Sequence, residues 1–181
     1  FLSTKTFLLE NNQTCSLLSY IFDYLLLNIN NQYDKNITKF SELFLITLAK
    51  SNHYFESQNN LINQIKISLN KILNLPESNE KYIKIQTLIN FINKLMESCS
   101  ISKLIINNNT INLIYKHNLI NDLTKIIHYI QISNPKLIDT INLILKSIET
   151  LSNIINYLKS LHKSDISHNL NVHLTGRYKN C

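Results

Sequence analysis

The sequence predicts an all-α protein, and three observations support that prediction. Glycine occurs once and proline twice in 181 residues, too few for the many tight turns of a β-rich chain. Apolar residues recur at helical spacing in successive segments. Asparagine clusters separate these segments, and asparagine both caps helices and tolerates the left-handed backbone conformation. The clusters predicted to be joints are Asn11-Asn12, Asn30-Asn31, Asn59-Asn60 and Asn107-Asn108-Asn109.

The first half of the chain contains four predicted helices. The apolar face of the first is Leu17, Leu18, Ile21, Phe22 and Leu25, widened by Tyr20 and Tyr24; that of the second is Phe40, Leu43, Phe44 and Leu48. The third runs from Ile62 to Leu73 and must stop before Pro76, since the residue preceding proline avoids helical geometry. Ser78 then caps a fourth helix that reaches Met96.

Three further helices are predicted in the second half. Two short ones, Thr110 to His117 and Leu119 to Ile130, meet at Asn118. The last begins at Ser133 or Asn134, with Pro135 near its first position, where a missing N–H costs nothing. Its stripe alternates spacings of four and three, as a coiled-coil seam does: Leu137, Ile141, Ile144, Ile148, Leu151, Ile155 and Leu158. Apolar residues off this stripe, Ile138, Leu143, Leu145 and Ile154, instead favour packing against more than one neighbour.

Helices of about 10 to 25 residues joined by short loops pack as antiparallel neighbours. The predicted architecture is therefore an irregular armadillo- or HEAT-like antiparallel helical stack, an α-solenoid segment, with a closed helical bundle as the alternative. We expect an extended lead-in at 1–12, a helical-repeat segment at 13–160 and a polar, loosely ordered tail at 161–181. Because the chain opens on Phe1 and its one methionine is Met96, we also expect it to be a piece of a longer protein.

Composition narrows the class of protein. Hydrophobic residues make up 44% and charged residues 17%, too apolar for intrinsic disorder. The longest uncharged apolar stretch, Leu43 to Ala49, is far shorter than the roughly 20 residues that cross a bilayer. The stretch from Phe1 to Leu9 is too polar for a secretory signal. An odd set of widely spaced cysteines, Cys15, Cys99 and Cys181, indicates a reducing compartment, the cytoplasm or nucleus.

The sequence predicts no catalytic residue, cofactor or metal site. Neither Cys15 nor Cys99 has a base and orienting group signalled beside it, and both are expected to be inert thiols near apolar helices. Scarce glycine excludes a P-loop and a dinucleotide fingerprint. His162, His168, His173 and Cys181 offer four zinc ligands, but their gaps exceed the tight pairs of structural zinc sites. Incidental histidines in a polar tail are the preferred interpretation.

The formal net charge of +6 invites a nucleic-acid interpretation. The lysines are scattered among asparagines and serines and form no run, as shown by Lys66, Lys71, Lys81, Lys84, Lys116 and Lys125. Such spacing is typical of a solvated surface. A free-standing basic helical module that binds protein partners or nucleic acid remains the alternative function.

Several stretches match one known family in the same order along the chain. They are Cys15-Ser16-Leu17-Leu18, Phe22-Asp23-Tyr24-Leu25-Leu26, Leu43-Phe44-Leu45 with Thr47-Leu48-Ala49, Glu77-Ser78-Asn79-Glu80-Lys81, Met96-Glu97-Ser98-Cys99, Leu119-Ile120-Asn121-Asp122-Leu123 and Leu145-Lys146-Ser147-Ile148-Glu149-Thr150-Leu151-Ser152. Together they resemble the giant HECT-type E3 ubiquitin ligases with UBA and WWE domains, the Mule group, in a helical stretch between the WWE and catalytic domains. The resemblance covers roughly Cys15 to Leu158.

The sequence departs from the family pattern at three places. Ser147 stands where the family has proline, so a kink expected there is absent or milder. Asn118 stands where the family has glycine, which suits a left-handed joint. The loop at Asn107 to Asn109 is shorter than the family's.

The resemblance implies a parent enzyme that moves ubiquitin from an E2 through a HECT cysteine onto substrate lysines. Nothing in this sequence matches that cysteine's domain, so neither Cys99 nor Cys15 inherits a catalytic role. The segment is then a non-catalytic scaffold that contributes to substrate presentation. Its implied partners are protein substrates and other parts of the parent ligase, whereas ubiquitin and E2 would meet the HECT domain alone. Neither nucleic acid nor a membrane is expected as a partner.

Overall fold

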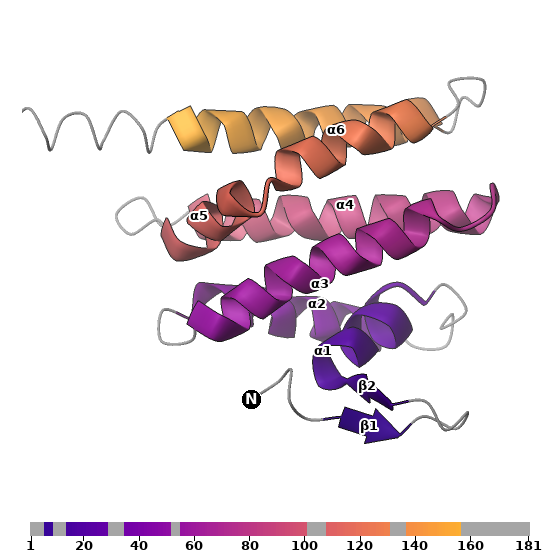
Figure 1. Cartoon of the computed structure of the whole chain (residues 1–181), viewed down its shortest axis with the longest axis vertical. Coiled ribbons are helices and arrows are strands. Elements are labelled where there is room, and N and C mark those ends of the chain that lie inside the picture. Colours follow the sequence, from indigo (N-terminus) through magenta and orange to yellow (C-terminus); the bar gives the residue numbers. More distant parts are fainter. Residues whose placement is uncertain are drawn as a thin grey trace, which may run out of the picture.

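The computed structural model describes residues 6–8, 14–28, 35–51, 55–100, 108–130 and 137–156, which form a stack of helices (Figure 1). In chain order the elements are strands β1 (Thr6–Leu8) and β2 (Thr14–Ser16), helix α1 (Leu17–Tyr20), the π-helix η1 (Ile21–Leu26), α2 (Lys35–Lys50), α3 (Phe55–Leu73), α4 (Asn79–Ser100), α5 (Asn108–Lys116), α6 (Leu119–Tyr129) and a helix over 137–156. The predicted all-α class is confirmed. The short antiparallel β1–β2 pair and the π-helical turns of η1 were not predicted.

The helices lie in two layers (Figure 1). One layer holds α2, α4 and the helix over 137–156, and the other holds η1, α3, α5 and α6. Successive helices α2, α3 and α4 run in alternating directions, so neighbours across the two layers are antiparallel, as predicted. Helices within one layer run parallel to each other.

Hydrogen bonds between helices of one layer show a constant sequence separation. The Gln86 amide of α4 donates to Thr140 Oγ1 (2.8 Å), and the Ser147 hydroxyl donates to Asn93 Oδ1 of α4 (2.8 Å); both pairs are 54 residues apart. Lys94 of α4 reaches Glu42 of α2, 52 residues earlier. Each layer therefore advances by one helix about every 50 residues, a period that the sequence did not reveal.

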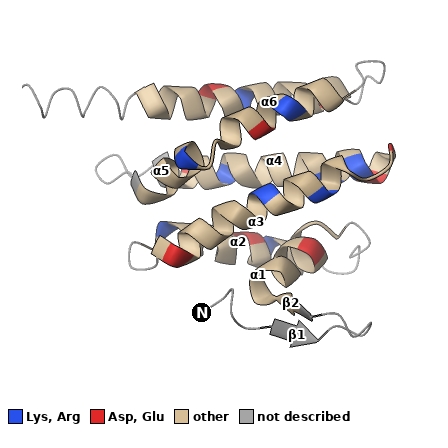
Figure 2. Cartoon of the chain, viewed as in Figure 1, with Lys and Arg blue, Asp and Glu red and all other residues tan. Residues whose placement is uncertain are grey.

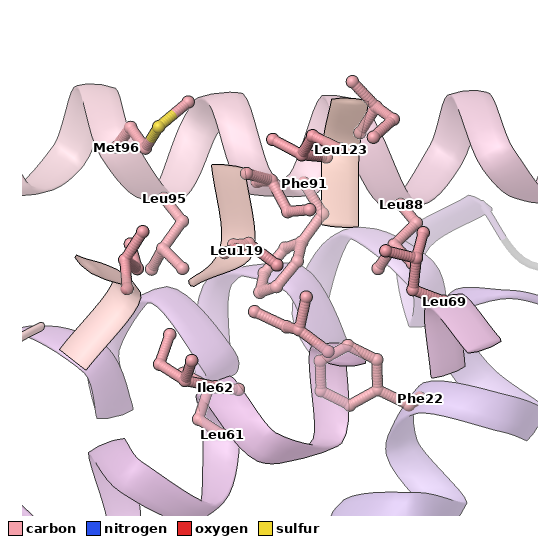
Figure 3. Close-up of a cluster of buried hydrophobic side chains, with 14 of the residues drawn as sticks. Phe22, Leu61, Ile62, Leu69, Leu88, Phe91, Leu95, Met96, Leu119 and Leu123 are labelled. Atoms are coloured by element: carbon pink, nitrogen blue, oxygen red, sulfur yellow. The ribbon is translucent and has the colours of Figure 1, made fainter. Parts of the chain in front are cut away.

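The core lies between the two layers (Figure 3). Phe22 of η1 and Phe91 of α4 are fully buried, and their rings meet edge to face with centroids 5.7 Å apart. Around them pack side chains of α3, α4 and α6, including Leu61, Ile62, Leu69, Leu88, Leu95, Leu119 and Leu123. A single core extends through every described helix, so no boundary divides this part of the chain.

Helix ends follow the predicted signals. At α1, where no cap was predicted, the Ser16 hydroxyl accepts the Ser19 N–H at 3.1 Å. α3 ends at Leu73, before Pro76, and the Ser78 hydroxyl accepts the Lys81 N–H at 3.2 Å to cap α4. Asn118 adopts the left-handed conformation between α5 and α6, with φ 56° and ψ 38°. The asparagine at the family's glycine position therefore makes the joint that was expected there.

One predicted joint is wrong. Asn59-Asn60 lies inside α3, which begins four residues earlier at Phe55. The buried side chains of Leu61 and Ile62 hold this turn against the core, and packing of an apolar face outweighs the weak helix propensity of asparagine. The Asn59 side chain is used for a tertiary contact instead, with His117.

The apolar face predicted for α2 is also wrong in part. Phe40, Leu43 and Phe44 are exposed by 69%, 59% and 44%, whereas the buried side chains are Ser41, Leu45 and Ala49. The buried residues are spaced four apart and form a narrow stripe of small and medium side chains. α2 thus has apolar residues on a second side, which the described part of the chain leaves exposed.

The last helix uses its predicted stripe within the chain. Leu137, Ile144, Leu151 and Ile155 are buried, and Ile141 and Ile148 pack against the core from its edge. The helix is continuous through Ser147, which stands at the family's proline position, so the expected kink does not break it. Burial of the stripe within this chain supports packing against neighbouring helices over a coiled-coil oligomer. The predicted caps of this helix, Ser133 and Asn134, lie outside the described residues.

Candidate functional site

No metal-binding cluster is found in the part of the chain that the structure describes. None of these residues forms a group of three or more His, Cys, Asp or Glu side chains suited to a metal ion. The four zinc candidates of the tail, His162, His168, His173 and Cys181, lie outside the described residues. Cys15 lies on β2, paired with Phe7, as a half-buried free thiol. Cys99 lies near the end of α4, and its side chain is outside the description.

Six lysines of the described segments have an acidic partner. The pairs are Lys66–Asp122 (3.1 Å), Lys71–Asp23 (2.7 Å), Lys81–Glu77 (2.7 Å), Lys84–Glu80 (2.6 Å), Lys94–Glu42 (2.7 Å) and Lys125–Asp122 (3.4 Å). Blue and red positions are both spread over the helices (Figure 2). A phosphate backbone needs several unpaired cations on one surface. The helical part of the chain does not present them at these six positions.

A polar cluster ties α3 to the α5–α6 joint. The His117 Nε2–H donates to Asn59 Oδ1 at 2.7 Å, and Lys66 Nζ donates to the His117 carbonyl at 2.5 Å. The same ammonium lies 3.1 Å from Asp122. Burial, followed by the charges of Lys66 and Lys116, lowers the pKa of His117 from its usual 6.5. His117 is therefore a neutral structural residue at pH 7.

A second polar cluster hydrogen-bonds to the backbone carbonyls at the C-terminal end of α2. The buried Gln58 amide donates to the carbonyls of Ala49 (2.9 Å) and Ser51 (2.8 Å). The buried Thr110 hydroxyl of α5 donates to the Ala49 carbonyl at 2.7 Å. Carbonyls at a helix C-terminus have no intrahelical partner. These side chains satisfy them and join α2, α3 and α5, which is a structural role.

A small hollow lies beside η1. Its volume is about 180 Å³, and its walls are Asp23, Leu27, Ser68, Lys71, Ile72, Leu75 and Lys84. Small-molecule sites typically measure about 300 to 1,000 Å³. Its charged walls are paired, Lys71 with Asp23 and Lys84 with Glu80. The hollow therefore has neither the size nor the unpaired polar groups of a ligand site.

The exposed side of α2 is the feature with the properties of an interaction surface. Ile37, Phe40, Leu43 and Phe44, which we call the α2 flank, are exposed by 41%, 69%, 59% and 44%. Contiguous exposed apolar side chains of this size typically mark an interface. The sequence held a signal for it, because apolar residues cover more of α2 than one neighbouring layer can bury.

Comparison with known proteins identifies relatives over most of the chain. No model of a known protein family matches the chain. Over most of its length, however, the chain is similar to a segment of a large E3 ubiquitin-protein ligase, as the sequence resemblance predicted. The relative is E3 ubiquitin-protein ligase HUWE1 of Mus musculus, 34% identical over 163 residues. HUWE1 of Rattus norvegicus matches with the same identity and length.

The match covers 84% of this chain and 4% of the mouse and rat proteins. The chain thus spans a twenty-fifth of the length of the curated relatives it matches. No helix in the described ranges is long and apolar enough to cross a membrane.

Proposed function

We propose that the chain is a non-catalytic helical scaffold segment of a HECT-type E3 ubiquitin ligase and contributes to the presentation of protein substrates. The observation that carries the proposal is the 34% identity to HUWE1 over 84% of the chain. The hydrophobic core that extends through the described helices is compatible with a structural role. The parent ligase, in the cytoplasm or nucleus, would supply the ubiquitin-transfer chemistry.

We further propose an armadillo- or HEAT-like architecture, with a helical-repeat segment at 13–160 and a polar tail at 161–181. Two observations support it: helices alternate between two layers, and contacts within a layer join residues 52 to 54 apart. In solenoids of this kind each repeat is one helical unit that contacts its neighbours in turn. In a closed bundle the large apolar side chains of each helix face one shared core, whereas Phe40, Leu43 and Phe44 of α2 are exposed.

Ubiquitin transfer tests the proposal in two arms. The purified 181-residue chain, mixed with E1, E2 and ubiquitin, is expected to form no thiol-sensitive ubiquitin adduct. The ligase expressed from its whole reading frame, with 13–160 deleted, is expected to keep thioester formation but to ubiquitinate a protein substrate at least several-fold more slowly. A control ligase with Cys15→Ser and Cys99→Ser should match the unmodified protein.

Either of two results would refute the proposal. A ubiquitin thioester on the isolated chain would assign it chemistry of its own. Unchanged substrate ubiquitination after the deletion would remove the role in substrate presentation. An early stop after residue 181 in the reading frame would separate the chain from any ligase.

A further inference from the structure

The α2 flank is oriented toward one end of the helical stack. An α-helix turns about 100° per residue, so Glu42 lies about 60° to one side of the buried Leu45, and Phe44 and Phe40 lie about 100° and 140° to the other side. Lys94 of α4 pairs with Glu42 at 2.7 Å and fixes that side as the one facing α4. Phe44 and Phe40 therefore lie on the side of α2 turned away from α4.

The neighbouring helix α4 has another helix of its layer on each side. α4 is flanked on one side by α2, through Lys94 and Glu42, and on the other by the helix over 137–156, through Gln86 with Thr140. α2 has α4 on one side and η1 toward the core, where Thr38 donates to the Leu25 carbonyl at 3.2 Å. Within the described ranges, no helix covers its remaining side.

From these observations we infer that the α2 flank packs against a further amphipathic helix of the same polypeptide, placed beside α2 as α2 is placed beside α4. The inference rests on the proposed function in one respect, that the chain is part of a longer ligase. The matched relatives are about twenty-five times longer than the matched segment, so further chain is available to supply this helix. The α2 flank exposes two phenylalanines, a leucine and an isoleucine together. Leaving such an apolar patch in contact with water is unfavourable, and patches of this kind typically mark an interface.

The geometry also defines the chemistry of this neighbouring helix. Its contacting side carries large apolar residues at three- and four-residue spacing, because it must cover Ile37, Phe40 and Phe44 along one helix. The neighbouring helix is therefore amphipathic, with its apolar side against the α2 flank.

Photo-crosslinking in the ligase expressed from its whole reading frame tests the inference. A benzophenone amino acid replaces Phe40, and mass spectrometry identifies the peptide joined to it after illumination. The expected product is an intramolecular crosslink to a peptide outside residues 1–181. The control places the same amino acid at Tyr129 of α6, a side chain 63% exposed in the other layer, which should not capture that peptide.

Every other product overturns the inference. A crosslink to a separate protein would make the flank a partner-binding site, and one to a second copy would make it a dimer interface. A crosslink within residues 1–181, or none, would show that no helix of the remaining polypeptide covers it. The readout does not depend on ubiquitin transfer, so its failure is distinct from failure of the scaffold role.

A stability comparison gives a second, independent measurement. Phe40→Asp is expected to leave the proteolysis rate of the 181-residue chain unchanged within twofold, because the side chain is exposed there. In the whole ligase the same change should accelerate cleavage within this segment at least tenfold, since it would bury a charge against an apolar helix. Lys39→Asp, a charge change at an exposed position on the side of α2 that carries Glu42, should accelerate cleavage less. Equal rates for Phe40→Asp in both proteins would contradict the inference.

Discussion

Gln58 shows how one buried side chain terminates a helix. Replacing it by leucine keeps the volume roughly similar but removes the donors to the Ala49 and Ser51 carbonyls. Thr110 still donates to the Ala49 carbonyl, whereas the Ser51 carbonyl loses its Gln58 donor. An acceptor left without a partner costs about 1–3 kcal/mol, so we expect Gln58→Leu to lower the free energy of unfolding by about the lower end of that range. Urea denaturation measures it. The control Asn70→Ala, on the exposed side of α3, should change stability by less than about 0.5 kcal/mol.

His117 makes stability depend on pH. Its pKa is lowered in the folded chain, chiefly by burial, so the unfolded chain binds the proton more readily. The contribution to stability is therefore complete above the unfolded pKa of about 6.5 and is lost as the pH falls below it. His117→Gln removes the titration while leaving a donor for Asn59.

Thermal melting from pH 7.5 to pH 5 compares the two proteins. The unmodified chain should lose more stability on acidification than His117→Gln. An equal or larger loss in the variant would show that His117 is not the group responsible.

At the residue scale, the sequence predicted signals that act locally. The cap at Ser78, the stop before Pro76 and the left-handed Asn118 depend on a few neighbouring residues, and all are found in the structure. The partners of Gln58 and His117 were not predictable, because they lie in other segments and sequence spacing does not show which segments meet.

Within α2, one helix provides both a core residue and an exposed apolar residue for comparison. Leu45→Ala removes a fully buried side chain and is expected to cost about 2–5 kcal/mol. Phe40→Ala removes a larger side chain that is 69% exposed, and should change the stability of the isolated chain by less than about 0.5 kcal/mol. Denaturant unfolding of both variants is the measurement. A larger loss for Phe40→Ala than for Leu45→Ala would contradict the orientation of α2.

At the element scale, prediction succeeded where apolar residues form one face and failed where they form two. The last helix buries the stripe from Leu137 to Ile155 that its spacing indicated. In α2 the large residues Phe40 and Phe44 suggested the wrong face, since hydrophobicity shows that a side chain favours burial but not which neighbour will bury it. η1 was predicted as an ordinary helix, because no sequence signal separated π-helical turns from α-helical ones.

For the whole molecule, the charge pairing predicts weak binding to nucleic acid. Six lysines of the described helices already have a carboxylate partner, so few counterions would be released from a phosphate backbone. We expect the dissociation constant for single- or double-stranded DNA to be micromolar or weaker, roughly as for non-specific binding at physiological salt. Fluorescence anisotropy over a series of salt concentrations measures it. Tighter binding with a steep salt dependence would favour the alternative function.

The overall class was predictable from the sequence, whereas the period of about 50 residues was not. The period is visible as contacts between Gln86 and Thr140 and between Asn93 and Ser147, polar pairs without a shared sequence motif. A spacing set by contacts between different residue types leaves no pattern in a single sequence.

These two hydrogen bonds also have a mechanical consequence. Both join α4 to the helix over 137–156. The bonded residues are seven positions apart on each helix, so the two bonds have the same spacing along both helices. Sliding one helix along the other would break both bonds at once, whereas tilting it about one bond strains the other only gradually. Under a pulling force, these two helices should therefore tilt relative to each other before either slides along its axis.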